Sequence, residues 1–259
     1  MPTATIQQYV QILLLLGSAL VAAKLYRNGL WRKYPIFFAY FVLRVPNFVW
    51  PLMVDTGSPV YLWLFLVTSP VFVIFYVLLV AELYRLILKK YRGMETMGRW
   101  VMYTASAASV VLSVLALLPR FTPAMPQRSR DLGYEYALER GIDLSLVVFI
   151  LLMLLFLSRF PIPLSRNVVV HAAIFTLYFL AAALGLLLHA LWGINLSAEL
   201  SLSLSCVSLL CVGAWLLLLN PAGENVPAHL PLLGSGDEEK ILRELDAVNA
   251  ALLRVSRQV

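Results

Sequence analysis

Residues 60–88 read VYLWLFLVTSPVFVIFYVLLVAELYRLIL, an apolar run whose only charged residues, Glu82 and Arg85, stand near its end. An α-helix needs about 20 predominantly apolar residues to cross about 30 Å of hydrocarbon, and this run is longer than that. In the whole chain 61% of the residues are hydrophobic and 13% are charged. Soluble domains have about 45–50% apolar and about 25% charged residues. We therefore expect an integral membrane protein.

Further apolar segments of this kind predict an all-α bundle of about seven transmembrane helices. Each span is expected to be helical, because unpaired backbone groups in hydrocarbon are costly. The segment at 35–54 is the least regular, since it contains Arg44, Pro46 and Pro51. The predicted spans are 6–26, 35–54, 60–88, 100–118, 142–158, 167–192 and 198–219.

The Lys and Arg residues of the connecting loops gather on one side of this predicted bundle. The loops after the first, third and fifth spans hold Lys24, Arg27, Arg32, Lys33, Arg85, Lys89, Lys90, Arg92, Arg99, Arg159 and Arg166. The other side holds Arg120, Arg128, Arg130 and Arg140. Because cytoplasmic loops are enriched in Lys and Arg, the N-terminus is predicted outside and the C-terminus in the cytoplasm. Without the 35–54 span the two most basic loops would fall on opposite sides, so we retain it.

The chain divides into a transmembrane domain at 1–220, a linker at 221–235 and a cytoplasmic helix at 236–259. Apolar residues recur in the last segment at heptad spacing, which is typical of a coiled coil or an amphipathic helix. They are Ile241, Leu245, Val248, Leu252 and Val255. This helix is expected to pair with its own copy, to dock on a cytoplasmic protein, to lie on the membrane surface, or to pack under its own bundle.

Arg44 is the most informative residue, because it falls near the centre of its predicted span. A charge at that depth costs at least about 2.5–3.5 kcal/mol on insertion scales and is expected to have a partner. Glu82 is predicted at a similar depth in the following helix, so we expect an Arg44–Glu82 ion pair or a water-bridged version of it, extended by Asn47. The pair either fixes helix register or forms the floor of a cavity that binds an anionic or carbonyl-bearing ligand.

Small residues recur on one face of two predicted spans. The fourth span has Ala105, Ser109 and Ser113, and the seventh has Ser201 and Ser205 in a series that continues to Ser208. Such faces let helix backbones approach closely. Helix packing is the preferred interpretation, and a hydrated path is the alternative.

Catalytic and cofactor chemistry has no motif in this sequence. We expect no catalytic residue, no metal and no cofactor, because no intramembrane cluster of His, Glu and Asp is found. His171 and His189 both lie on the sixth span and no other span has a histidine, which disfavours heme between helices. The net charge of +6 belongs to membrane-flanking loops, so nucleic-acid binding is not expected.

Three short segments carry a resemblance to a family. YPIFFAYFVLR at 34–44, ELYRLILKKYRG at 82–93 and RFPIPLSRN at 159–167 resemble the cytoplasmic junctions of small, uncharacterised bacterial seven-helix membrane proteins. The resemblance implies a fold and a bacterial plasma (inner) membrane, and it implies no chemistry.

Three functions stay open at this point. The leading hypothesis is a non-enzymatic sensor or scaffold that signals through its C-terminal helix to a cytoplasmic partner or to its own copy. The second is a small-molecule transporter or ligand carrier with a cavity near Arg44. The third is an accessory subunit of a membrane complex. Pro46, Pro51 and Pro70 bend the second and third helices, either for shape or to open a cavity.

Overall fold

The structure is a computed structural model. It describes residues 2–54, 58–88, 141–143, 145–152, 164–192, 197–225 and 227–228, with single positions and short stretches between 96 and 111, at 138 and between 246 and 250. Five of the described helices are long and apolar enough to cross a membrane. They are α1 (Pro2–Arg27), α2 (Pro35–Met53), α3 (Pro59–Ile87), α6 (Arg166–Trp192) and α7 (Ser197–Leu218). The helical class and the membrane character predicted from the sequence are therefore confirmed.

The predicted fourth and fifth spans, 100–118 and 142–158, are described only in part. Gly141–Leu152 is an apolar helix that is shorter than a membrane span, so the count of about seven stays a prediction. Glu82 near the end of α3 and His171 near the start of α6 line the same small void, which puts α3's last turns and α6's first turns at one end of the bundle.

Proline residues set the points where α2 and α3 begin. Pro35 and Pro59 stand at the start of their helices. The missing N–H of proline is no loss there, and its fixed φ suits the first turn. Ser58 caps α3, because its Oγ accepts a hydrogen bond of 3.1 Å from the backbone amide of Tyr61. Both helices thus start where the sequence predicted, within one residue.

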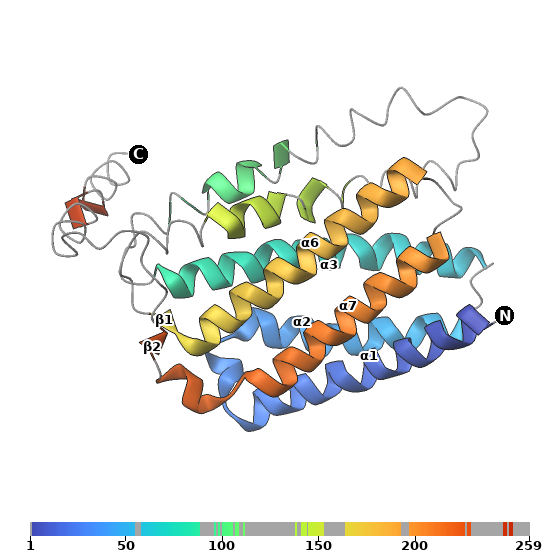
Figure 1. Ribbon diagram of the computed structural model, residues 1–259, viewed down its shortest axis with the longest axis horizontal. Coiled ribbons are helices and arrows are strands. Elements are labelled where there is room, and N and C mark those ends of the chain that lie inside the picture. Colours follow the sequence, from blue (N-terminus) through green and yellow to red (C-terminus); the bar gives the residue numbers. More distant parts are fainter. Residues whose placement is uncertain are drawn as a thin grey trace.

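One end of the bundle, here called the basic end, is where α1, α3 and α7 finish and α2 and α6 begin (Figure 1). The 3₁₀ turn η1 (Leu30–Arg32) connects α1 to α2, and η4 (Pro221–Glu224) follows α7. Strands β1 (Leu164–Ser165) and β2 (Pro227–Ala228) form a short antiparallel pair beside them. Apart from Arg44, every Lys and Arg of the five long helices and their described connections lies at this end: Lys24, Arg27, Arg32, Lys33, Arg85 and Arg166.

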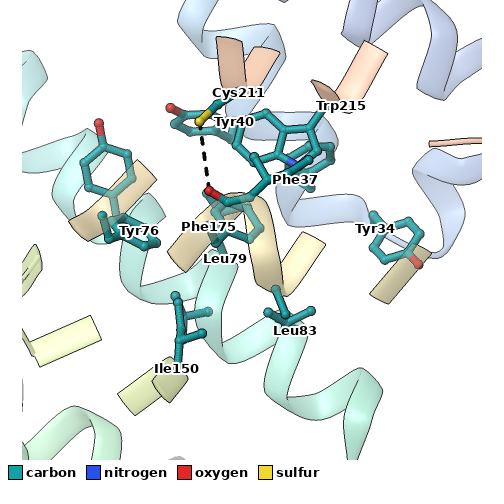
Figure 2. Close-up of a cluster of buried hydrophobic side chains, with 14 of the residues drawn as sticks. Tyr34, Phe37, Tyr40, Tyr76, Leu79, Leu83, Ile150, Phe175, Cys211 and Trp215 are labelled. Atoms are coloured by element: carbon teal, nitrogen blue, oxygen red, sulfur yellow. Dashed lines mark hydrogen bonds between the residues drawn. The ribbon is translucent and has the colours of Figure 1, made fainter. Parts of the chain in front are cut away.

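The packing core lies between α2, α3, α6 and α7 and is rich in aromatic rings (Figure 2). Phe37 of α2 meets Trp215 of α7 edge-on at 5.2 Å between ring centroids, and Phe175 of α6 lies 5.0 Å from Trp215. Lipid tails are as apolar as these side chains, so helix association in a membrane depends on close packing rather than on exclusion of water. Edge-to-face rings give that packing a defined geometry.

Candidate functional site

Arg44 lies at the tenth of nineteen positions of α2 and is only 6% exposed. Its Nη2 donates a hydrogen bond of 2.5 Å to Oγ of Ser208 on α7. Its Nη1 is buried and has no hydrogen-bond partner among the described residues. The guanidinium is therefore only partly satisfied at the middle of a membrane-spanning helix.

Three aromatic rings surround this guanidinium. Its Cζ lies 5.4 Å from the ring centroid of Tyr40, 6.0 Å from that of Phe41 and 5.2 Å from that of Phe48. A cation over an aromatic face gains about 0.5–2 kcal/mol, more when it is desolvated. The rings thus stabilise the cation without cancelling its charge.

The predicted ion pair between Arg44 and Glu82 is wrong. Oε1 of Glu82 accepts a hydrogen bond of 3.0 Å from the backbone N–H of Ile36, and Oε2 accepts one of 3.0 Å from that of Phe37. These amides belong to the first turn of α2, where N–H groups have no partner within the helix and the helix dipole favours an anion.

The depth estimated from the sequence did not take into account that the backbone amides of Ile36 and Phe37 compete with Arg44 for the Glu82 carboxylate. Ile36 precedes Arg44 by eight positions, which is roughly 12 Å along the helix axis. Glu82 therefore lies much closer to the basic end than Arg44 does, and a bridging water does not span that separation. Within the described part of the chain, Arg44 forms no ion pair with any acidic side chain.

A pocket of about 310 Å³ lies beside Arg44, between α2 and α3, with one contribution from α1. The described residues that line it are Gln11, Tyr40, Arg44, Asn47, Phe48, Trp50, Pro51, Tyr61, Phe65, Thr68, Ser69, Phe72 and Tyr76. Pro51 is itself in the lining, and other lining residues flank Pro46 and Pro70, the remaining prolines inside these helices. The position of the pocket near these prolines agrees with the interpretation in which they open a cavity.

Asn47 lines the same pocket as Arg44, one helical turn further along α2. Its Oδ1 accepts a hydrogen bond of 3.1 Å from Nε1 of Trp50. This bond fixes the orientation of the amide, and the Nδ2 group has no hydrogen-bond partner among the residues described. Arg44 and Asn47 thus offer donors to the pocket, and Arg44 is the only charged residue in the described lining.

Ser208 is the partner of Arg44 that the sequence did not identify as such. The serine series of α7 predicted a packing face, and the structure uses its members in different ways. Ser201 accepts a hydrogen bond of 3.2 Å from Nε2 of Gln7, whereas Ser205 bonds to the carbonyl of Ser201 in its own helix. The recurrence of serine on one face of α7 is the sequence feature that indicates polar contacts between this helix and its neighbours.

The other predicted residues are placed only in part. Ala105 is described, and its side chain is exposed. Ser109, Ser113 and the tail residues Ile241, Leu245, Val248, Leu252 and Val255 lie outside the described residues. The packing face of the fourth span and the interaction face of the tail therefore stay predictions.

A second polar cluster lies at the basic end and is here called the Glu224 junction. Its members are Lys33, Tyr34, Asn167, Asn220 and Glu224. Glu224 forms a salt bridge with Lys33, accepts a 2.7 Å hydrogen bond from the Tyr34 hydroxyl and accepts a 2.5 Å bond from Nδ2 of Asn167. The same Nδ2 donates to the carbonyl of Asn220 at 2.9 Å. The junction thereby ties the start of α2, the start of α6 and the end of α7 together.

The pKa values of Glu224 and Tyr34 are shifted in the directions that preserve the hydrogen bonds of this junction. Burial by itself raises the pKa of Glu224, but hydrogen bonds from Lys33, Tyr34 and Asn167 outweigh it, and the net pKa is lowered from 4.5. Burial, together with the bond to the Glu224 carboxylate, raises the pKa of Tyr34 above its usual value. The carboxylate is thus ionised and the phenol neutral at neutral pH. No periodic pattern in the sequence predicts this contact, because its residues are far apart in the chain.

His171 is a polar residue that is buried among the aromatic rings of the core. It is 2% exposed, and its ring lies 4.5 Å from Phe37 and 4.7 Å from Tyr34 between centroids. Among the described residues, no group of three or more His, Cys, Asp and Glu side chains could hold a metal ion. The Arg44 pocket, which has a buried charged side chain in its described lining, is the candidate ligand site.

Comparisons with protein-family models, with curated proteins and with solved structures found no match to this chain. The resemblance to bacterial seven-helix proteins stays a prediction, and function is argued from the geometry of the pocket.

Proposed function

We propose that this protein is a membrane sensor that binds a small organic anion in the Arg44 pocket. The observation that supports it is a buried arginine, without an acidic partner among the described residues, lining a pocket of about 310 Å³. Small-molecule pockets usually have about 300–1,000 Å³, apolar and aromatic walls and a few placed polar groups. Ionisable residues inside a membrane often mark such sites.

The energetic reason is the cost of an uncompensated charge. A buried cation loses its hydration, and a hydrogen bond donated to one serine hydroxyl, together with aromatic rings, restores only part of the lost stabilisation. An anion seated beside Arg44 would form a charge-assisted hydrogen bond, which is about twice as strong as a neutral one. The pocket therefore favours an acid over a neutral compound of the same shape.

The arrangement in the membrane completes this proposal. We place the basic end in the cytoplasm, with the N-terminus outside, about seven spans, and a bacterial inner membrane as the location. The gathering of Lys and Arg at one end of the long helices supports this orientation. The pocket then extends from mid-membrane toward the outer side, since Trp50 and Tyr61 stand near the opposite helix ends.

Signalling through the helix at 236–259 is the output we propose, toward a cytoplasmic partner or a second copy of the chain. Deleting this segment is expected to abolish self-association or partner binding, as measured by native mass spectrometry in mild detergent. Unchanged association would remove the output from the proposal and would leave ligand binding untouched.

Carriage of the ligand across the membrane is the second candidate function. The observation that favours it is the place of the pocket, beside Arg44 at mid-helix and flanked by the prolines of α2 and α3. Transporters commonly bind substrates near the bilayer midplane between interrupted helices. Uptake of a radiolabelled acid into proteoliposomes distinguishes a carrier from a sensor.

Thermal unfolding of the full chain in detergent tests the binding step. Benzoate and heptanoate are each compared with their neutral amides, benzamide and heptanamide. We expect at least one acid to stabilise the protein more than its amide. Arg44→Gln should remove that difference, and Arg44→Lys should keep part of it because the charge remains. Arg85→Gln is the matched control, since Arg85 is exposed on α3. The proposal fails if neither acid differs from its amide.

A further inference from the structure

The apolar part of the Arg44 pocket has an unusual composition. Its described lining contains Tyr40, Phe48, Trp50, Tyr61, Phe65, Phe72 and Tyr76 together with Pro51, and no Leu, Ile, Val, Met or Ala. Aliphatic residues are abundant in the same two helices. The sequence therefore does not lack aliphatic side chains near the pocket; they are placed elsewhere.

Helix α3 shows where its aliphatic residues go. Val67 is 60% exposed and Ile74 is 59% exposed, and both project from the bundle rather than into the pocket. Phe65, Phe72 and Tyr76 of the same helix line the pocket. Trp63 is the exception, since it is 70% exposed, and it stands in the first turns of α3, near the level where tryptophan suits the membrane interface. The helix thus gives an aliphatic face to lipid and an aromatic face to the pocket.

From this separation, which rests on the proposed function, we propose that the ligand is an aromatic carboxylate of one or two rings. Aromatic walls offer offset-stacked and edge-to-face contacts to a planar ring, and an alkyl chain cannot use these contacts. An apolar cavity of about 150 Å³ accepts benzene. A pocket of about 310 Å³ has room for one or two fused rings and a carboxylate.

The charge of the pocket selects the acidic group. Arg44 is the only charged residue among the described residues of the lining, so it balances a single negative charge. A phosphate carries about −1.5 to −2 at neutral pH and would keep an uncompensated charge inside the membrane. A carboxylate carries one charge, and its oxygens accept hydrogen bonds from donors such as the Nδ2 of Asn47, which lines the pocket beside Arg44.

Equilibrium binding of defined acids to the full chain in detergent tests the ligand class. The probes are benzoate, 2-naphthoate and heptanoate; heptanoate has the same numbers of carbon and oxygen atoms as benzoate. Trp50 lines the pocket, so its fluorescence reports occupancy. We expect both aromatic acids to bind about tenfold more tightly than heptanoate, the scale of aromatic pairing beyond area burial. Heptanoate binding as tightly as benzoate or more tightly overturns the inference, although the proposed anion site stands.

Substitution of the walls gives an independent check. Phe72→Leu replaces an aromatic lining residue by an aliphatic one of similar hydrophobicity and is expected to weaken 2-naphthoate binding while heptanoate binding is kept or improved. Trp63→Leu is the matched control on the same helix, because Trp63 does not line the pocket. Equal losses for both acids in Phe72→Leu would mean that the ring does not select the ligand, and the inference would fall. If none of the acids binds the wild-type chain, the proposed function fails as well.

Discussion

The Arg44 pocket and the Glu224 junction both place a charged side chain where several helices meet, but they satisfy it differently. Glu224 has Lys33, Tyr34 and Asn167 as donors, all from the chain itself. Arg44 has the hydroxyl of Ser208 and aromatic rings, and one of its terminal nitrogens has no partner among the described residues. A charge whose partners are all present holds helices together. A charge that lacks a partner and lines a cavity is suited to a ligand.

The largest expected effect is loss of ligand binding in Arg44→Gln. Removing a hydrogen bond to a charged group costs about 1.5–3 kcal/mol, which weakens acid binding by about ten- to a hundredfold. The ligand-free protein should not lose stability, because the glutamine can still bond to Ser208 and no longer carries a buried charge. Titration of 2-naphthoate and thermal unfolding in detergent measure the two effects.

The same two measurements can contradict the distinction between Arg44 as a ligand-binding residue and Glu224 as a structural residue. If Arg44→Gln unfolds more easily than the wild type by as much as a variant of the Glu224 junction does, Arg44 is a structural residue like Glu224. Arg27→Gln is the control for a change of net charge, since Arg27 is exposed at the end of α1.

A loss of stability is expected for Asn167→Ala at the junction. Asn167 is fully buried and donates from one nitrogen to both Asn220 and Glu224. Truncation leaves these acceptors short of a donor, which costs about 1–3 kcal/mol. Thermal unfolding should show this loss, with 2-naphthoate affinity unchanged. A shift in affinity without a loss of stability would show that the two regions are coupled.

Much of the fold follows from the sequence because the bilayer imposes strict rules. Length and hydropathy located the five long helices of the structure, and Pro35 and Pro59 marked where two of them begin. Depth in the predicted span alone marks Arg44 as the most informative residue of the sequence. These inferences need only local composition and the thickness of the hydrocarbon.

Pairing partners were not predictable in the same way. Depth placed Glu82 near Arg44, but the carboxylate had a competing partner in the free amides of Ile36 and Phe37. Ser208 was visible only as a member of a small-residue face. The contact of Lys33 with Glu224 joins residues 191 positions apart, and no periodicity connects them. Local pattern gives which residues are buried, and tertiary packing decides what each of them contacts.

A pH-dependent loss of stability should separate the junction from the pocket. The folded pKa of Glu224 is lowered below 4.5, so the stability it contributes is present above its unfolded pKa and is lost as the pH falls through the folded value. The temperature of thermal unfolding should therefore fall below about pH 4.5, and it should fall less steeply in Glu224→Gln than in the wild type. Glu199→Gln is the matched control, because Glu199 is exposed at the opposite end of the bundle. Equal declines in the wild type and Glu224→Gln would contradict the assignment.

The smallest effect is expected for Lys33→Ala, although Lys33 forms the only ion pair among the described residues. The Lys33 side chain is 41% exposed while that of Glu224 is 12% exposed, so water replaces much of what the ammonium provides. Ion pairs of this kind contribute about 0–1 kcal/mol. Tyr34 and Asn167 still hold the carboxylate after the substitution. Thermal unfolding should show a loss well below that of Asn167→Ala, and the loss should shrink further at high salt. A loss as large as that of Asn167→Ala would mean that net charge, rather than the network of buried hydrogen bonds, stabilises this end of the bundle.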